Sequence, residues 1–249
     1  MEMPILFVFG PFKIYTLSLF LVMAFLWSGF VISRKAAEYH LGEIEIFDGL
    51  VLTLIGVWGL SRLVTYLKID GLNELVIWLV MILSAAVLSK REETRLFTVL
   101  DIFALGLMMV LAWWNLGLFW AGDLTGKLID NNLGINVLVG RAFPVELLSS
   151  FLYLLTFMWL WRTERTYRTI NWYKGRKSTA NTGFIFAVAL ILFGLINAVS
   201  TGLRERVNEL ELIVSGITFL SGLIVIYWQA ERNLKSDLRL ITGMFVRKA

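Results

Sequence analysis

The chain has 249 residues, of which 58% are hydrophobic, and its mean hydropathy is +0.74. Such a composition favours an integral membrane protein and leaves no room for a separate soluble domain. The chain contains no cysteine, which excludes disulfides, thiol catalysis and cysteine-ligated metals. The net charge of +4 and the pI near 9.4 indicate contact with anionic lipid rather than with nucleic acid.

Seven apolar stretches are each about long enough to cross a bilayer, whose hydrocarbon core needs roughly 20 helical residues. Their bounds are Ile14–Ile32, Ile46–Leu67, Leu72–Leu88, Leu96–Trp120, Phe143–Trp161, Asn181–Leu203 and Leu210–Trp228. The first stretch lacks a basic segment before it and a small-residue cleavage site after it, so we expect it to remain in the mature protein. We therefore predict an all-α, polytopic fold that forms one membrane domain over residues 1–249.

The basic residues predict the orientation of these spans. Of the 23 Lys and Arg residues, 16 lie in the connections 33–45, 89–95 and 162–180 and in the tail from 229. Cytoplasmic loops of membrane proteins carry an excess of Lys and Arg. We therefore expect the N-terminus to lie outside and the C-terminus in the cytoplasm.

Two segments outside the spans have apolar residues to bury. Residues 121–142 mix Gly, Asn and Asp with short apolar runs, which predicts a compact extracytoplasmic cap. The tail 231–249 repeats apolar residues every three or four positions among basic ones, which predicts a helix on the inner membrane surface. The one histidine, His40, lies beside acidic residues in a predicted loop, and we interpret it as a solvated residue. No metal site and no cofactor is predicted.

Small residues on two spans favour close helix packing, because they let neighbouring backbones approach. They are Gly49, Gly56 and Gly59 on the second span and Ser215, Thr218 and Gly222 on the seventh.

Polar residues within the spans have two interpretations each. Arg62, near the outer end of the second span, either extends to the headgroups or binds a phosphate. Asp101 either pairs with a nearby cation or provides a negative charge at a helix N-terminus. Asn115 and Asn197 either form interhelical hydrogen bonds or line a polar cavity.

Several motifs occur in an order that resembles the prolipoprotein diacylglyceryl transferases of bacteria. They are FGPFKIYTLSLF (9–20), GLSRLVTYL (59–67), LFTVLDIFALGL (96–107), WNLGLFWAGDLTG (114–126), RAFPVELL (141–148) and NTGFIFAVALILFGLINAVSTGLRE (181–205). In the fourth motif, Gly117, Phe119 and Gly126 match the family signature, and Asp123 replaces its acidic residue. The similarity extends over nearly the whole chain.

This resemblance implies a reaction, substrates and a location. Such enzymes move a diacylglyceryl group from phosphatidylglycerol to the lipobox cysteine of a prolipoprotein. They release glycerol phosphate at the outer face of the bacterial cytoplasmic membrane. The partners implied are phosphatidylglycerol or another anionic phospholipid and the signal segments of prolipoproteins. The chemistry requires a base for the thiol and cations for the phosphate.

The sequence departs from the family pattern at the positions that carry this chemistry. Leu75 stands at the place of the family's histidine, and Asn115 and Asn197 stand at the places of two arginines. Leu118 and Ala121 replace two asparagines of the signature, and Phe143 replaces a second histidine. A fold can persist while its site changes, so the resemblance predicts architecture better than activity.

Three functions are therefore compatible with the sequence. The first is a divergent transferase, with the base drawn from one group of acidic residues and the lipid bound by a group of basic and amide residues. The second is an inactive relative that binds phospholipid or a lipoprotein segment without turnover. The third is a small transporter, although the two halves of the chain lack a matching pair of interrupted helices. The candidate bases are Glu74, Asp123 and Glu146, and the candidate lipid-binding residues are Arg62, Arg141, Arg204, Asn115 and Asn197.

Overall fold

The computed structural model describes residues 5–9, 12–67, 72–122, 125–129, 134–137, 140–166 and 182–229. The helices are α1 (Thr16–Glu38), α2 (Glu43–Tyr66), α3 (Asn73–Arg91), α4 (Leu96–Trp120), α5 (Val145–Thr166), α6 (Phe184–Leu203) and α7 (Glu209–Gln229). Two antiparallel hairpins accompany them, formed by β1 (Ile5–Phe9) with β2 (Phe12–Tyr15) and by β3 (Ile135–Val137) with β4 (Gly140–Ala142). The helical fold class is confirmed. The sequence did not predict the hairpins.

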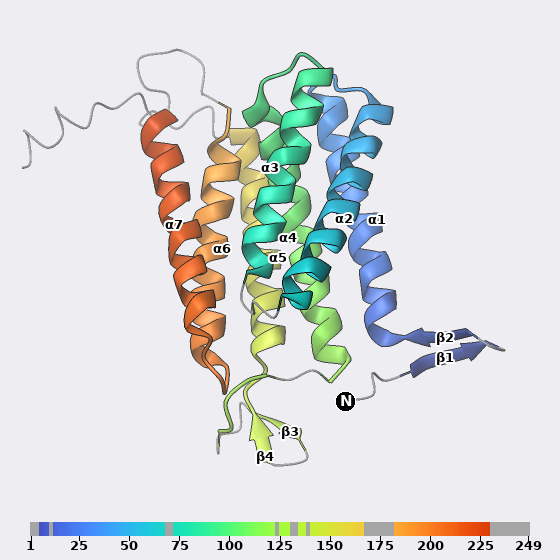
Figure 1. Ribbon diagram of the computed structural model, residues 1–249, viewed down its shortest axis with the longest axis vertical. Coiled ribbons are helices and arrows are strands. Elements are labelled where there is room, and N and C mark those ends of the chain that lie inside the picture. Colours follow the sequence, from blue (N-terminus) through green and yellow to red (C-terminus); the bar gives the residue numbers. More distant parts are fainter. Residues whose placement is uncertain are drawn as a thin grey trace, which may run out of the picture.

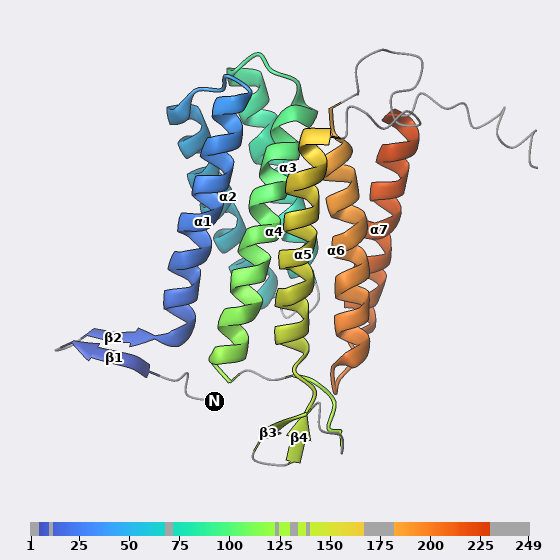
Figure 2. The ribbon, with the colours of Figure 1, turned by 180° about the vertical axis from the view of Figure 1, so that it is seen from behind.

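The helices form one bundle in which successive helices run in opposite directions (Figures 1 and 2). In both views α1 and α2 lie on one side, and α6 and α7 lie on the other, with the remaining helices between them. All four strands lie at the end of the bundle where α1, α3, α5 and α7 begin, which we name the strand end. We name the other end the basic end, since it joins the connections 33–45, 89–95 and 162–180.

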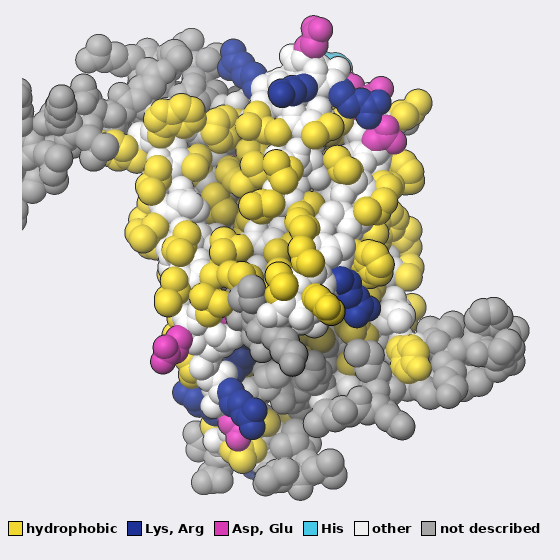
Figure 3. Space-filling view, viewed as in Figure 1, with side chains coloured by type: hydrophobic (Ala, Val, Ile, Leu, Met, Phe, Trp, Pro, Cys, Tyr) yellow, Lys and Arg dark blue, Asp and Glu magenta, His cyan; other side chains and the backbone are white. Residues whose placement is uncertain are grey.

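Within the described residues, five helices are long and apolar enough to cross a membrane, namely α1, α2, α4, α6 and α7. Figure 3 shows a broad apolar band on the face of the bundle, with the charged side chains gathered mainly at the two ends. This distribution is that of a protein embedded in lipid. The helices α3 and α5 are not among the five, so the seven-span topology and the orientation of the termini stay predictions.

The first span differs from its predicted bounds. The structure begins α1 at Thr16 rather than at Ile14, because Phe12–Tyr15 pairs with β1 in a hairpin. The helix then continues beyond Ile32 to Glu38. Short apolar runs fit a strand and a helix equally well, which explains the difference at the N-terminal end.

The packed centre of the bundle is formed by α4 and α6. Side chains with no exposed surface include Val99, Ala104 and Met108 of α4 and Ile185 and Ala189 of α6. The outer helices instead expose large apolar residues, such as Trp58 of α2 and Ile224 of α7. Because lipid tails are as apolar as leucine, the helices associate through close packing and polar links rather than through exclusion of water.

Two glycines bring α6 and α7 into backbone contact. A Cβ atom at Gly222 would lie 2.6 Å from the carbonyl oxygen of Ala187, and one at Gly194 would lie 2.6 Å from that of Ser215. Ser215 and Thr218 are buried in the same contact, with their hydroxyls bonded to their own helix. The small-residue face predicted for the seventh span is therefore a packing face.

The three glycines of α2 differ in how closely neighbouring helices approach them. A Cβ at Gly56 would lie 2.7 Å from Val80 of α3, and one at Gly49 would lie 3.2 Å from Phe103 of α4. A Cβ at Gly59 would meet nothing within 4 Å. The predicted packing face therefore includes Gly49 and Gly56 but not Gly59.

A carboxylate of α4 caps the start of α6. The two oxygens of Asp101 accept hydrogen bonds from the backbone N–H groups of Gly183, at 2.6 Å, and Phe186, at 2.8 Å. Helix N-termini leave such donors without partners inside their own helix. The sequence suggested an ion pair or a charge at the start of the fourth span, whereas the carboxylate caps another helix, α6. The ion pair of Arg91 is formed instead with Asp48.

Candidate functional site

A short extended segment, 125–129, joins the parts of the chain that meet at the strand end. It pairs on one side with 141–143, which precedes α5, and on the other with 203–205, at the C-terminal end of α6. On the side of 203–205, Lys127 N donates to Leu203 O at 3.0 Å and Glu205 N donates to Thr125 O at 2.9 Å. On the side of 141–143, Phe143 N donates to Lys127 O at 3.0 Å and Ile129 N donates to Arg141 O at 2.8 Å. The segment thereby fixes the start of α5 relative to the end of α6.

Gly126 is the residue of this segment that lies between Phe143 and Arg204. It is buried and forms an antiparallel bridge with Arg204. A Cβ atom at this position would overlap the carbonyl oxygen of Phe143. A side chain therefore cannot be added unless one of the two neighbouring segments moves. This requirement gives a physical reason for the last glycine of the motif WNLGLFWAGDLTG.

Glu146 is held by the residue before this glycine. Its side chain lies in the first turn of α5 and is only 3% exposed. The Oε1 atom accepts hydrogen bonds from the backbone N–H of Thr125, at 3.1 Å, and from its hydroxyl, at 2.5 Å. The Oε2 atom is buried and has no hydrogen-bond partner among the described residues. A buried acceptor without a partner is costly, so this oxygen is ready to accept a proton or a donor.

Arg204 lies on the other side of the same segment. Its Nη1 atom donates to Oε2 of Glu211 in α7, at 2.7 Å, and Thr201 donates to the same oxygen, at 3.3 Å. The Nε–H of Arg204 is buried and has no partner among the described residues. Guanidinium N–H groups bind phosphate and carboxylate oxygens with favourable geometry. We name Thr125, Gly126, Glu146, Arg204 and Glu211 the strand-end cluster.

The cluster therefore offers two complementary groups around one segment. One is a carboxylate oxygen that can take a proton, and the other is a guanidinium N–H that can donate to an anion. Both are largely removed from water, where charge–dipole and charge–charge interactions are stronger than in bulk solvent. Such a pair of groups suits a reaction in which one proton is removed and a phosphate departs.

The two asparagines at the places of the family's arginines are bonded within the protein. Asn115 donates from Nδ2 to the carbonyl oxygen of Leu111 in its own helix, at 2.8 Å. Asn197 accepts from the hydroxyl of Tyr153 at 2.6 Å, and Tyr153 is 1% exposed. For Asn197 this is the interhelical hydrogen bond considered from the sequence. A substrate-binding role for either asparagine stays a prediction.

Arg62 is remote from the strand-end cluster. It is exposed on α2, between the exposed apolar residues Trp58 and Tyr66. Figures 1 and 2 place α2 on the side of the bundle away from α6 and α7, so Arg62 and Arg204 do not meet at one site. Arg141 of β4 is also exposed, at the strand end. Their roles as lipid ligands stay predictions.

The side chains of the other two candidate bases, Glu74 and Asp123, are not among those described. Glu74 belongs to the first turn of α3 at the strand end, and its side chain is not among those described. Leu75, at the place of the family's histidine, is half-buried beside it. Asp123 lies outside the described residues, as do the connection 167–181 and the tail 230–249. The surface helix predicted for 231–249 is therefore not tested.

Three members of the strand-end cluster were not among the predicted site residues, and one of them, Gly126, was noted only as a match to the family signature. Thr125 gave a weak signal, since it directly precedes the motif's last glycine. Glu211 is an acidic residue seven positions after Arg204, across the turn between two spans. Opposite charges on either side of a short turn between helices could have identified this pair.

Comparison with known proteins adds an independent finding. A family model described as prolipoprotein diacylglyceryl transferase matches residues 4–228 of the chain. This range includes both hairpins, the whole strand-end cluster and all seven helices, except for Gln229, the last residue of α7. The comparison with curated proteins gave no match.

Proposed function

Because the chain belongs to the prolipoprotein diacylglyceryl transferase family, we propose that it transfers diacylglyceryl from phosphatidylglycerol to the lipobox cysteine of a prolipoprotein. In this reaction the thiol loses its proton and a sulfur–carbon bond forms at the glyceryl carbon. The carbon–oxygen bond to the phosphate breaks, and glycerol phosphate leaves. The site is the strand end, which faces outward if the 16 basic residues of the other side lie in the cytoplasm.

We assign the removal of the thiol proton to Glu146 and the binding of the phosphate to Arg204. Among the three candidate bases, Glu146 is the one whose described side chain is buried at the strand end with an open oxygen atom. The open Nε–H of Arg204 supplies a donor for the phosphate oxygens as their charge increases. The observation that carries this proposal is the contact of a single segment, Thr125–Gly126, with both residues.

A second function is favoured by the residues at the family's key positions. Leu75 cannot accept a proton, and Asn115 and Asn197 carry no charge for a phosphate. Each lost group of this kind typically costs about 10²–10³-fold or more in rate. The second candidate is therefore a relative that binds phospholipid, or the signal segment of a lipoprotein, without turnover.

Purified protein mixed with phosphatidylglycerol and a fluorescent lipobox peptide separates the two functions. We expect slow formation of the diacylglyceryl thioether, at a rate too low to restore growth of a strain depleted of its own transferase. In Glu146→Gln, which retains Oε1 for Thr125, product formation should fall by about 100-fold. Glu209, an exposed residue in the first turn of α7, gives the matched control, Glu209→Gln.

The outcomes of this assay are distinct. Product that depends on Glu146 supports the transferase. Co-purified phosphatidylglycerol without product, reduced by Arg204→Gln but not by Arg206→Gln, supports the binding protein. Rapid turnover and full growth of the depleted strain would contradict the weakening that we infer from Leu75, Asn115 and Asn197. Neither product nor bound lipid would reject both functions.

A further inference from the structure

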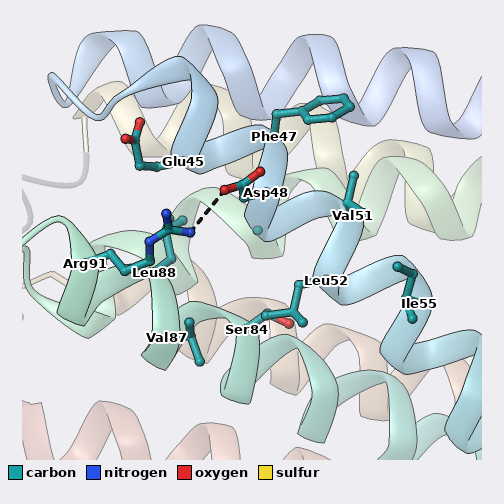
Figure 4. Close-up of a pocket in the computed structure, with 11 residues that line it drawn as sticks. Glu45, Phe47, Asp48, Val51, Leu52, Ile55, Ser84, Val87, Leu88 and Arg91 are labelled. Atoms are coloured by element: carbon teal, nitrogen blue, oxygen red, sulfur yellow. Dashed lines mark hydrogen bonds and ion pairs between the residues drawn. The ribbon is translucent and has the colours of Figure 1, made fainter.

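A second site lies at the basic end, away from the strand-end cluster. A groove of about 350 Å³ runs between α2 and α3. Cavities that bind small ligands typically have volumes of roughly 300–1,000 Å³. Figure 4 shows its charged residues at one end and its apolar residues continuing along α2 and α3.

The long part of the groove is apolar. It is lined by Val51, Leu52 and Ile55 of α2 and by Val87 and Leu88 of α3. Leu52, Ile55 and Val87 are at least 45% exposed, so these side chains face the surroundings of the bundle rather than its core. Around a membrane protein those surroundings are lipid tails, so an apolar hollow of this kind suits an acyl chain.

The mouth of the groove carries charges of both signs. Arg91 at the end of α3 donates from Nη1 to Oδ2 of Asp48 in α2, at 3.1 Å. The two side chains are 56% and 49% exposed. Glu45, one turn before Asp48, also lines the groove. The mouth therefore holds one guanidinium paired with Asp48, and a second carboxylate, that of Glu45, which Figure 4 shows turned away from Arg91.

We propose that this groove binds a zwitterionic ethanolamine phospholipid from the leaflet at the basic end. The remaining N–H groups of Arg91 bind its phosphate, and the carboxylates of Asp48 and Glu45 bind its ammonium group. One acyl chain lies along Leu52 and Ile55. A lipid with net negative charge brings no ammonium group to these carboxylates, and its negative headgroup would be repelled by them.

This inference does not rest on the proposed function. The groove is formed by α2 and α3 at the basic end, whereas the strand-end cluster is formed by the segment 125–129 with α5, α6 and α7 at the other end. Failure of the transferase assay therefore leaves the lipid site untouched, and failure of the lipid site leaves the transferase untouched.

The test compares two lipids with identical acyl chains. The protein is placed in nanodiscs that contain equal amounts of palmitoyl-oleoyl phosphatidylethanolamine and phosphatidylglycerol. It is then released into detergent, and the lipids retained are counted by native mass spectrometry. The competition is measured in Arg204→Gln, which removes the phosphate ligand proposed for the strand end. We expect this protein to retain phosphatidylethanolamine at least about threefold more than phosphatidylglycerol, a ratio typical of one exposed charge pair.

Two pairs of variants locate the bound lipid. Arg91→Gln removes the phosphate ligand, and Arg95→Gln removes an exposed cation at the same end that does not line the groove. Leu52→Trp fills the channel, and Leu54→Trp places the same ring on another face of α2. We expect Arg91→Gln and Leu52→Trp each to lower retained phosphatidylethanolamine about threefold or more, and the two controls to leave it unchanged.

The lipid competition in Arg204→Gln decides the matter even if a groove variant fails to fold, because the phosphate ligand proposed for the strand end is absent there. Equal retention of the two lipids, or preference for phosphatidylglycerol, would overturn the proposal. Equal loss in both members of a pair would also overturn it, because the lipid would then be bound elsewhere.

Discussion

Lys35 of α1 and Glu164 of α5 form a buried ion pair, with 2.5 Å between Nζ and Oε2. Lys35 has no exposed side-chain surface, and its Nζ also lies 4.5 Å from the ring centroid of Trp161. Glu164 accepts a further hydrogen bond from the hydroxyl of Tyr39, at 2.9 Å. The pair links the first and fifth helices at the basic end of the bundle, although their contact is formed by residues 129 positions apart.

Removing one member of this pair should destabilise the bundle strongly. In Lys35→Met the carboxylate of Glu164 would stay buried without its cation, which costs about 3–5 kcal/mol. We expect a loss of that size in the free energy of unfolding, measured by denaturant titration in detergent micelles.

The exposed pair of Arg91 and Asp48 provides the control for this measurement. Arg91→Gln removes a cation from a pair that is about half exposed, where such contacts contribute about 1 kcal/mol or less. An equally small loss in Lys35→Met would show that the buried pair contributes no more than a surface pair.

Gly126 should tolerate no side chain. In Gly126→Ala the new methyl group would overlap the carbonyl oxygen of Phe143, so the pairing of 125–129 with 141–143 must shift. We expect loss of transfer or lipid binding at the strand end, together with a lower melting temperature. Gly202→Ala is the matched control, because a Cβ at Gly202 meets nothing within 4 Å. Similar behaviour of the two variants would show that the overlap is relieved without cost.

Asp101 should stabilise α6 from outside that helix. Asp101→Ala leaves two buried N–H groups without acceptors, at about 1–3 kcal/mol each. Asp101→Asn retains one oxygen and should lose less. Hydrogen exchange at the first turn of α6 should rise in the order wild type, Asn, Ala. Protection that is unchanged in Asp101→Ala would mean that another group caps the helix.

The predicted orientation can be tested without background, because the chain has no native cysteine. Glu205, at the strand end, and Lys90, at the basic end, are both exposed. Single cysteines at these positions should react with an impermeant thiol reagent from opposite sides, Glu205→Cys from outside. Labelling of both from the same side would reject the alternating topology.

The helices could be predicted from the sequence because each is one continuous apolar run. The run Leu96–Trp120 coincides with α4, since Arg95 precedes it and Gly122 and Asp123 follow it closely. The hairpin β1–β2 could not be predicted, because Phe12–Tyr15 continues directly into the apolar run of α1. The backbone pairing that separates a strand from a helix depends on the partner strand, which hydropathy does not reveal.

The residues of the candidate site were only partly predictable. Glu146 and Arg204 carried a family position or a charge at a span end, and both lie in the strand-end cluster. Their partners are 21 and 7 positions away, on other elements, so the contacts depend on how α5, α6 and α7 pack. Arg62 had the same signals as Arg204 but lies on the other side of the bundle. The position of a residue along a span predicts its depth in the membrane, but it does not predict on which face of the bundle the residue lies.

A connecting loop usually both joins two helices and determines where the second helix begins. Here the second of these roles belongs to α4, which caps α6. The carboxylate of Asp101 fixes where α6 begins, so the residues between α5 and α6 need only be long enough to span the gap. The entropy of closing a loop rises slowly with its length. Insertions and deletions in that connection should therefore accumulate during evolution without displacing α6 or Arg204, which directly follows it.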